Sequence, residues 1–265
     1  MNQFITSNGN QIAYTIDGDG PWLTLSHSLA SNMSMWNPQM HILTKHFKVL
    51  RFDTRGHGKS SGPIDPYTLD DLAQDSYDLF QTLGVDRTHW LGLSMGGMIG
   101  QTLILKYPHL FTSLVLADTT SKRPDNARQM WGERILQAKT EGMTAMVDST
   151  LQRWFADDFR KNNPAIIQEI AYGIGSTSVN GFCGCCEAIS HINTFDRLTE
   201  ITCPTLIMVG EHDHGTPPHM AKSMKEKMPN AHFHEIPNAG HISNVEQPEI
   251  FNQYLMAFYK SHNFI

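Results

Sequence analysis

Residues 88–101 read T-H-W-L-G-L-S-M-G-G-M-I-G-Q and place a hydroxyl group among residues with almost no side chain. Ser94 lies between Gly92 and Gly96, after an apolar run and before a helix-like run. This is the G-x-S-x-G pattern, in which a sharp strand-to-helix turn exposes a serine as a nucleophile. The helix that begins there would direct free N–H groups toward any negative charge that forms. The plainer interpretation is a tight turn that needs small residues.

Glycine-rich turns also bind nucleotides, but this turn departs from both common patterns. A dinucleotide site needs G-x-G-x-x-G at the start of a helix, and here Ser94 takes the place of the second glycine. A phosphate loop needs G-K followed by serine or threonine, which this segment lacks. We therefore expect no nucleotide cofactor.

A serine nucleophile needs a base, and the base needs an acid that orients it. On this type of sheet the order along the chain is serine, acid, histidine. Asp213 follows a predicted strand at 204–209, and His241 follows the last predicted strand, at 231–236. Both loops are expected at the carboxyl edge of parallel strands, where ligands bind. Ser94, Asp213 and His241 are therefore the predicted catalytic residues.

Other polar residues beside the acid offer alternatives. His212 and His214 flank Asp213 in G-E-H-D-H-G-T-P-P and could suggest a metal site. Alternate residues on an extended loop point apart, and no third ligand is evident, so no metal site is predicted. Glu211 is an alternative acid, less favoured because it lies closer to the end of the strand.

The oxyanion that forms on nucleophilic attack needs two backbone N–H donors. Met95, directly after the nucleophile, would supply one. The other is expected from the loop after an early strand, S-H-S-L-A at 26–30, in which Leu29 is the predicted donor. Because both donors belong to the backbone, neither residue needs a polar side chain.

Strands and helices alternate in the first part of the chain and again at its end. Apolar spacing predicts a helix at 68–83 and a final helix at 248–259. This alternation predicts an α/β protein with a mostly parallel central sheet flanked by helices. Besides the run before Ser94, the predicted strands are 11–16, 22–25, 47–52, 113–117, 204–209 and 231–236.

The middle of the chain differs from both ends, because it has no strong buried strand. It has four helix-like stretches with glycine-containing breaks between them, at 128–139, 143–155, 164–170 and 181–192. A helical block between two halves of a sheet pattern is typical of a lid inserted into a sheet domain. We therefore predict a core formed by residues 1–121 and 200–265 and a helical lid formed by residues 122–199.

Composition limits the classes of partner. A chain of 265 residues with 40% hydrophobic residues can form one large domain with a sizeable core. Its net charge of −6 offers no basic field for nucleic acid or an anionic membrane surface. No apolar run reaches the roughly 18 residues of a membrane span. The first ten residues lack the order of a secretory signal. We expect a cytoplasmic protein with a small-molecule partner, and its oligomeric state stays open.

The four cysteines are Cys183, Cys185, Cys186 and Cys203. Adjacent Cys185 and Cys186 are poor disulfide partners, and the spacing does not match the paired ligands of a zinc site. Free thiols in a reducing compartment are the expected state.

Six stretches spread over the predicted core match the motifs of a known family. With them the chain resembles the α/β-hydrolases, and specifically the 3-oxoadipate enol-lactonases of aromatic catabolism. The stretches are H-S-L-A-S-N-M-S-M-W (27–36), F-D-T-R-G-H-G-K-S (52–60), G-L-S-M-G-G-M-I-G-Q (92–101), L-V-L-A-D-T (114–119), G-E-H-D-H-G-T-P-P (210–218) and A-G-H-I-S-N-V-E-Q-P (239–248).

The resemblance implies hydrolysis of a lactone or small carboxylic ester through an acyl-enzyme without a cofactor, most specifically of 3-oxoadipate enol-lactone. The free carboxylate of such a substrate needs a cation, and an arginine matches a carboxylate in geometry. Arg134 and Arg153 each lie beside a tryptophan in the predicted lid. Trp131, Arg134 and Trp154 are therefore candidate substrate contacts. The alternative is that the arginines are solvated helix charges and the tryptophans part of the lid core. The lid stretches that resemble the lactonases are W-G-E-R-I (131–135), E-G-M-T-A-M (141–146), R-W-F (153–155) and the cysteine pair at 185–186.

Other activities share the same core motifs. General carboxylesterases, C–C bond hydrolases, cofactor-free haloperoxidase-like enzymes and non-catalytic ligand receptors on this fold stay open as alternatives. Two residues depart from the family pattern: His214, where a small residue or proline is expected, and Ala30, at a position that is often glycine. Both lie close to the predicted site, so they bear on the choice of substrate.

Overall fold

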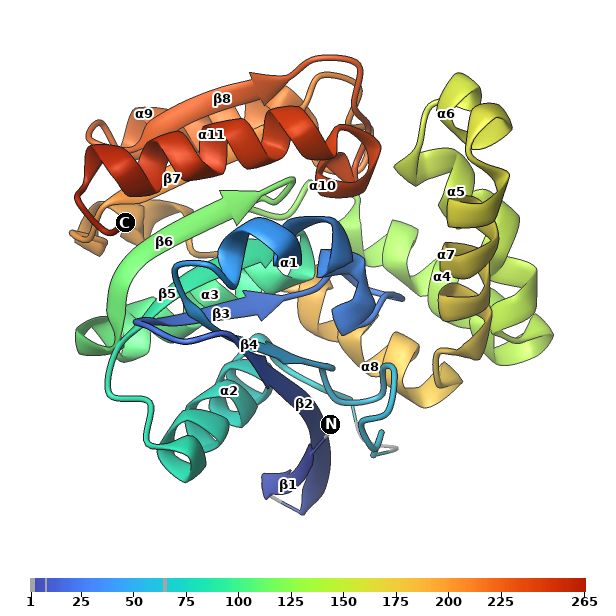
Figure 1. Cartoon of the computed structure of the whole chain (residues 1–265). Helices are drawn as coiled ribbons and strands as arrows, with labels where there is room; N and C mark the ends of the chain where they lie inside the picture. Colours follow the sequence, from blue (N-terminus) through green and yellow to red (C-terminus); the bar gives the residue numbers. More distant parts are fainter. Residues whose placement is uncertain (1–2, 8, 64–65) are drawn as a thin grey trace.

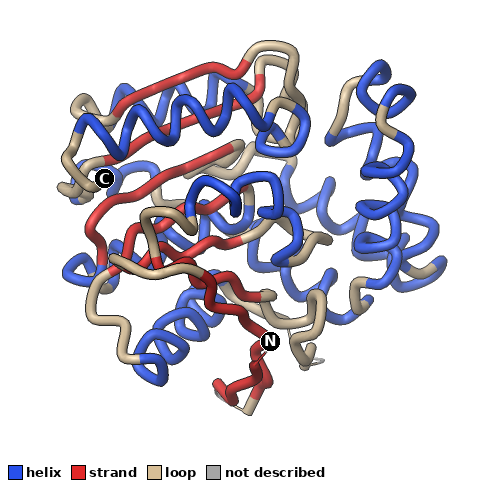
Figure 2. The backbone as a smooth tube through the Cα atoms, viewed as in Figure 1, coloured by secondary structure: helices blue, strands red, loops and turns tan. Residues whose placement is uncertain are grey.

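The computed structural model describes residues 3–7, 9–63 and 66–265, and it contains an eight-stranded sheet (Figures 1 and 2). The strand order is β1-β2-β4-β3-β5-β6-β7-β8. The pairs β1–β2 and β2–β4 are antiparallel and the other pairs are parallel, so the predicted mostly parallel sheet is confirmed. The strands are β1 (Gln3–Ser7), β2 (Asn10–Asp17), β3 (Trp22–Ser26), β4 (Lys48–Phe52), β5 (Thr88–Leu93), β6 (Phe111–Ala117), β7 (Thr205–Gly210) and β8 (His232–Ile236).

Helices cover both faces of this sheet, which is why the central strands are buried along their whole length. Every residue of β5 and of β7 is buried. In Figure 1, α1 and α11 lie in front of the sheet, and α3 and α9 lie behind it. The helices that accompany the sheet are α1 (Asn37–Leu43), α2 (Leu69–Leu83), α3 (Met95–Lys106), α9 (Pro218–Lys227), α10 (Ser243–Glu246) and α11 (Pro248–Ser261).

The sequence sets the limits of α2 clearly. Thr68 caps its first turn: the Thr68 hydroxyl accepts the Asp71 N–H, and the Asp71 carboxylate accepts the Thr68 N–H. Gly84 ends the helix in the left-handed conformation, at φ 66°. The helix then supports the loop before it, because Asp75 binds the Arg55 guanidinium at 2.5 and 2.6 Å.

A group of helices lies between β6 and β7 in the chain. Figure 1 shows α4 to α7 together at the side of the sheet toward which the parallel strands point. The carboxyl edge of the parallel strands therefore faces this helical segment. Its helices are α4 (Ala127–Glu141), α5 (Val147–Trp154), α6 (Asp157–Asn162), α7 (Pro164–Ser176) and α8 (Val179–Ser190).

The structure differs from the sequence prediction in several elements, among them helices α1, α9 and α10, which were not predicted. Strand β1 and helix α6 were not predicted; both are short, at 5 and 6 residues, and give little periodic signal. Helix α7 continues to Ser176, six residues beyond the predicted end at 170. Gly173 and Gly175 lower helix propensity, but α7 packs against the short helix at Met143–Met146, and that packing outweighs the local preference.

The structure also describes the state of the cysteines and the hydropathy of the helices. All four cysteines are free thiols, and Cys183, Cys185 and Cys186 are buried in α8. Among the described residues, no helix combines the length and the hydropathy that crossing a membrane requires.

Candidate active site

The turn after β5 places Ser94 in a backbone conformation that few residues adopt. Ser94 has φ 54° and ψ −114° and directly precedes α3. A side chain on Gly92 would collide with the Gly96 backbone, and one on Gly96 would collide with the Ser26 backbone. The two glycines are therefore required by close backbone approach, and the turn holds Ser94 at the N-terminus of the helix.

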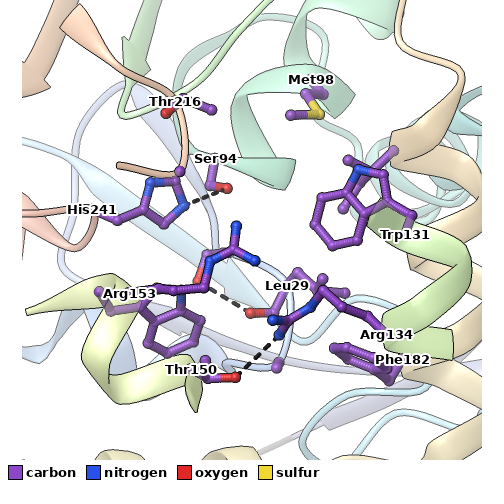
Figure 3. Close-up of a pocket in the computed structure, with 15 residues that line it drawn as sticks. Leu29, Ser94, Met98, Trp131, Arg134, Thr150, Arg153, Phe182, Thr216 and His241 are labelled. Carbon is purple, nitrogen blue, oxygen red and sulfur yellow. Dashed lines mark hydrogen bonds between the residues drawn. The ribbon is translucent and has the colours of Figure 1, made fainter. Parts of the chain in front are cut away.

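A continuous chain of hydrogen bonds joins the three predicted catalytic residues, and Figure 3 shows the part between Ser94 and His241. The Ser94 Oγ lies 2.9 Å from His241 Nε2, and His241 Nδ1 lies 2.9 Å from each carboxylate oxygen of Asp213. Asp213 also accepts the Gly215 N–H at 2.7 Å, and the N–H and hydroxyl of Thr216 at 2.9 and 2.7 Å. The loops after β5, β7 and β8 meet at one edge of the sheet, which brings together residues 147 positions apart.

Burial and charge set the protonation of this chain. Burial alone would lower the pKa of His241, but the charge and hydrogen bond of Asp213 outweigh it and raise that pKa above 6.5. Burial alone would raise the pKa of Asp213, but the charge and hydrogen bond of His241 and the Thr216 bonds lower it. Asp213 is thus an ionised acceptor that holds the proton of His241 on Nδ1, which leaves Nε2 free to accept the Ser94 proton.

A second carboxylate, Asp118, lies beside this chain and was not singled out from the sequence. Its oxygens accept the Gly210 N–H at 2.8 Å and the Ser243 hydroxyl at 2.5 Å. Burial and the charge of Asp213 raise its pKa. Asp118 therefore joins the ends of the loops that carry Asp213 and His241. The signal available in the sequence was its place directly after β6, on the same edge of the sheet.

The loop after β3 carries the predicted oxyanion donor Leu29. Ala30, the next residue, has φ 56°, which explains why glycine suits that position. The Ala30 N–H donates to His57 Nε2 at 3.0 Å, so it is not available to a substrate. The Leu29 N–H has no acceptor among the residues that the structure describes. The Met95 N–H is likewise one of the unpaired donors of a helix N-terminus.

Two buried histidines fix this loop from behind. His27 Nε2 accepts the Thr54 N–H at 2.9 Å, while His57 Nε2 accepts the Ala30 N–H. In both rings, Nδ1 lies within hydrogen-bond distance of a backbone carbonyl oxygen, so each ring carries its proton on Nδ1. Burial lowers the pKa of His27 to about 4 and that of His57 to about 3, and both stay neutral near pH 7.

Ser94 and His241 open into a small cavity of about 60 Å³, which we call the serine cavity. The three predicted substrate contacts, Trp131, Arg134 and Trp154, all line it. Arg153 does so too, so the interpretation of both arginines as solvated helix charges is wrong. The remaining lining residues are Ser28, Leu29, Ala30, Met98, Thr150, Phe182, Ile189, Gly215 and Thr216.

Both arginines are half-buried and lack an acidic partner. Arg134 Nη2 donates to the Thr150 hydroxyl at 3.1 Å, and Arg134 Nε is buried without a hydrogen bond. Neither arginine forms an ion pair with any carboxylate of the described residues. Burial and the charge of Arg153 lower the pKa of Arg134 to about 10, which leaves it a cation near neutral pH. Figure 3 shows both guanidinium groups directed into the cavity.

The other polar residues near Asp213 lie away from the cavity. His212 and His214 are exposed, and Glu211 accepts the Asn238 N–H rather than a bond from His241. Within residues 3–7, 9–63 and 66–265, no group of three or more His, Cys, Asp or Glu side chains could hold a metal ion.

Known proteins share this architecture. The family model described as the alpha/beta hydrolase fold matches residues 21–248. The chain belongs to the α/β-hydrolase family. It is 33% identical over 245 residues to 3-oxoadipate enol-lactonase 2 of Acinetobacter baylyi, which covers 92% of this chain and 91% of the relative.

Solved structures agree over nearly the whole chain. The enol-lactonase from Burkholderia xenovorans LB400 is 34% identical, with a TM-score of 0.94 over 97% of this chain and all of the other. A thermophilic esterase from Thermogutta terrifontis, solved with malate bound, is 26% identical, with a TM-score of 0.92 over 98% of each chain. These comparisons place the chain in a hydrolase family.

Proposed function

We propose that this protein hydrolyses a carboxylate-bearing lactone or small ester through an acyl-enzyme on Ser94, most specifically 3-oxoadipate enol-lactone. The observation that carries the proposal is the unbroken chain from Ser94 through His241 to Asp213 at a cavity lined by arginines. The relatives named as enol-lactonases support the choice of substrate. A cytoplasmic location is part of this proposal, as the place where such catabolic substrates arise.

Each residue of the chain has a distinct role in the proposed reaction. His241 Nε2 takes the hydroxyl proton as Ser94 Oγ attacks the carbonyl carbon. The N–H groups of Leu29 and Met95 bind the oxyanion. The C–O bond then breaks, and His241 returns the proton to the departing enolate or alkoxide. Asp213 stays ionised and stabilises the imidazolium that forms.

The acyl-enzyme is cleared by the same groups in reverse order. A water molecule gives its proton to His241 Nε2 as its oxygen attacks the acyl carbon. The second oxyanion occupies the same two N–H donors. When the acyl–Oγ bond breaks, His241 protonates Ser94 and the free acid leaves. No external oxidant, reductant or cofactor enters this balance.

The helical segment would choose the substrate. We propose that residues 122–199 form a lid over the core of residues 1–121 and 200–265, and that Arg134 and Arg153 bind the substrate's carboxylate. Arg134 has a buried Nε without a partner, and an arginine fork suits two carboxylate oxygens. Trp131 and Trp154 would pack against the apolar part of the substrate. The esterase solved with malate bound is a related example with a dicarboxylate.

The test compares two substrates in two proteins. Wild type and Ser94→Ala are assayed with 3-oxoadipate enol-lactone and with p-nitrophenyl acetate, and kcat/KM is measured for each. The proposal expects lactone turnover that disappears in the variant. Turnover of the acetate without turnover of the lactone would support a serine hydrolase and contradict the lactone as its substrate. Equal activity of the two proteins would remove Ser94 as nucleophile.

A further inference from the structure

A second, larger cavity lies next to the serine cavity. It measures about 330 Å³, and we call it the apolar groove. One wall comes from the core and the other from α7 of the helical segment. Most of its lining is apolar: the core contributes Met35, Pro38, Ile242, Val245 and Pro248, and α7 contributes Ile166 and Ile170.

The apolar groove adjoins the serine cavity. Ala30 and Trp154 line both cavities, and Ile242 of the groove directly follows His241. The backbone joins the two sides as well, because the His241 N–H donates to the Trp154 carbonyl at 2.9 Å. A substrate whose carbonyl reaches Ser94 therefore has the groove as the next space for the rest of its chain.

The two cavities differ in the chemistry that they offer. Arg134 and Arg153 line the serine cavity, whereas the charged residue of the groove is Glu169, which is exposed at its edge. A carboxylate is favoured beside the arginines and disfavoured beside Glu169. Apolar surface such as an alkyl chain is stabilised in the groove by removal from water.

We propose that the apolar groove binds an alkyl chain, so that the protein also accepts esters with a carboxylate on one side of the scissile bond and an apolar chain on the other. This inference rests on the proposed function for the role of Ser94 and the arginines. It goes beyond it, because a small enol-lactone would leave the groove empty.

The first measurement is a chain-length series in the wild-type protein. Methyl, propyl and hexyl monoesters of adipic acid carry the carboxylate on the acyl side. Carboxymethyl esters of acetic, butanoic and heptanoic acids carry it on the alcohol side. In one series, kcat/KM is expected to rise about tenfold or more from the shortest to the longest chain, because each buried methylene adds affinity. The series that shows the rise identifies which side of the ester occupies the groove. No rise in either series overturns the inference.

A binding measurement separates this inference from the catalytic proposal. Ser94→Ala cannot form the acyl-enzyme, so calorimetry can measure the Kd of the shortest and the longest ester of each series. The groove predicts a Kd about tenfold lower for the longest ester in one of the two series, even if wild type proves inactive. Equal Kd values for the shortest and the longest ester in both series would overturn the inference while leaving the activity of wild type untouched.

A variant of Gly173 tests the place of binding. A Cβ atom added at Gly173 would lie 3.3 Å from the Asn32 side-chain nitrogen across the groove, so Gly173→Leu narrows it. The hexyl-to-methyl ratio of kcat/KM and of affinity is expected to fall to near one. Gly132→Leu is the matched control, because a Cβ there meets no atom within 4 Å and Gly132 lines neither cavity.

The variants lead to distinct conclusions. Thermal unfolding of both leucine variants shows whether each is folded at the assay temperature. A ratio that persists in folded Gly173→Leu overturns the groove as the binding place. If Gly173→Leu does not fold, Ile170→Asp puts a charge on the same wall and is expected to lower the same ratio. A ratio unchanged in Ile170→Asp as well overturns the inference.

Discussion

The carboxyl edge of the sheet and the helical segment beside it satisfy their charged groups in opposite ways. At the sheet edge, the Asp213 carboxylate accepts bonds from His241, Gly215 and Thr216. Across the cavity, Arg134 has a buried nitrogen without a partner, and Arg153 forms no ion pair with any described carboxylate. A buried charge without a partner is costly.

This difference indicates separate roles for the sheet edge and the helical segment. The sheet edge is complete without ligand, so it can be arranged for the reaction before the substrate arrives. The two arginines form no ion pair with a described carboxylate, so an anionic group that enters the cavity would meet two cations without displacing an existing partner. We infer that the sheet edge performs the reaction and that the helical segment selects anionic substrates.

Removal of the proposed orienting acid should give the largest effect. In Asp213→Asn the amide can no longer hold the His241 proton on Nδ1, so kcat should fall about 10⁴-fold. Turnover of p-nitrophenyl acetate measures the loss. Glu211→Gln is the control: Glu211 is exposed, accepts the Asn238 N–H and lies 3.8 Å from His212 Nε2, and the variant should keep its rate. A comparable loss in both variants would show that the effect is not specific to Asp213.

Removal of an arginine that is proposed to bind the substrate should give a smaller effect, and this effect should depend on the charge of the substrate. For Arg134→Met, kcat/KM for monomethyl adipate should fall about 10- to 100-fold, because charge-assisted hydrogen bonds are lost. The value for neutral dimethyl adipate should change little. Arg128→Met, an exposed position on the same helix, is the control. Equal losses for the two esters would remove Arg134 as a carboxylate site.

The two regions should also be linked through pH. His241 must be neutral to act as a base, and its pKa is raised above 6.5, so kcat/KM should decline as pH falls through a value above 6.5. The positive charge of Arg153 lowers that pKa. In Arg153→Met the acid limb should therefore move to higher pH. A pH–rate profile of each protein measures the limb, and a shift to lower pH would refute the link.

The smallest effect concerns stability behind the oxyanion loop. The pKa of His57 is lowered from 6.5 to about 3 by burial and by His27, so its contribution to stability is complete above pH 6.5 and is lost as pH falls toward 3. Between pH 6.5 and about 5 this loss amounts to roughly 2 kcal/mol. Glutamine can accept the Ala30 N–H without titrating. As pH falls, the free energy of unfolding should therefore decrease less in His57→Gln than in wild type. Denaturant titrations at several pH values measure this decrease. If the free energies of the two proteins decrease in parallel, the prediction is wrong.

Much of the sheet and the order of its polar loops could be predicted from the sequence, because these features have local signals. Gly92 and Gly96 mark the sharp turn, and buried strands precede Asp213 and His241 as apolar runs. The chain order of the three residues then limited which loops had to meet.

The features that were missed depend on distant contacts. Whether Arg134 is solvated or faces a cavity depends on how α4 and α5 pack, which helix periodicity does not specify. Asp118 gained its place only because β6 lies between β5 and β7 in the sheet. The apolar groove has no sequence signal, because its walls come from segments more than 100 residues apart, such as Met35 and Ile170.

The most direct test of the central claim is covalent labelling of the proposed nucleophile. The protein is incubated with an alkyl fluorophosphonate, its residual esterase activity is measured, and the modified peptide is identified by mass spectrometry. The account predicts one phosphonyl group per chain, on Ser94, with activity lost in proportion to labelling. Full activity in the labelled protein, or an adduct on another residue that accounts for the lost activity, would contradict it.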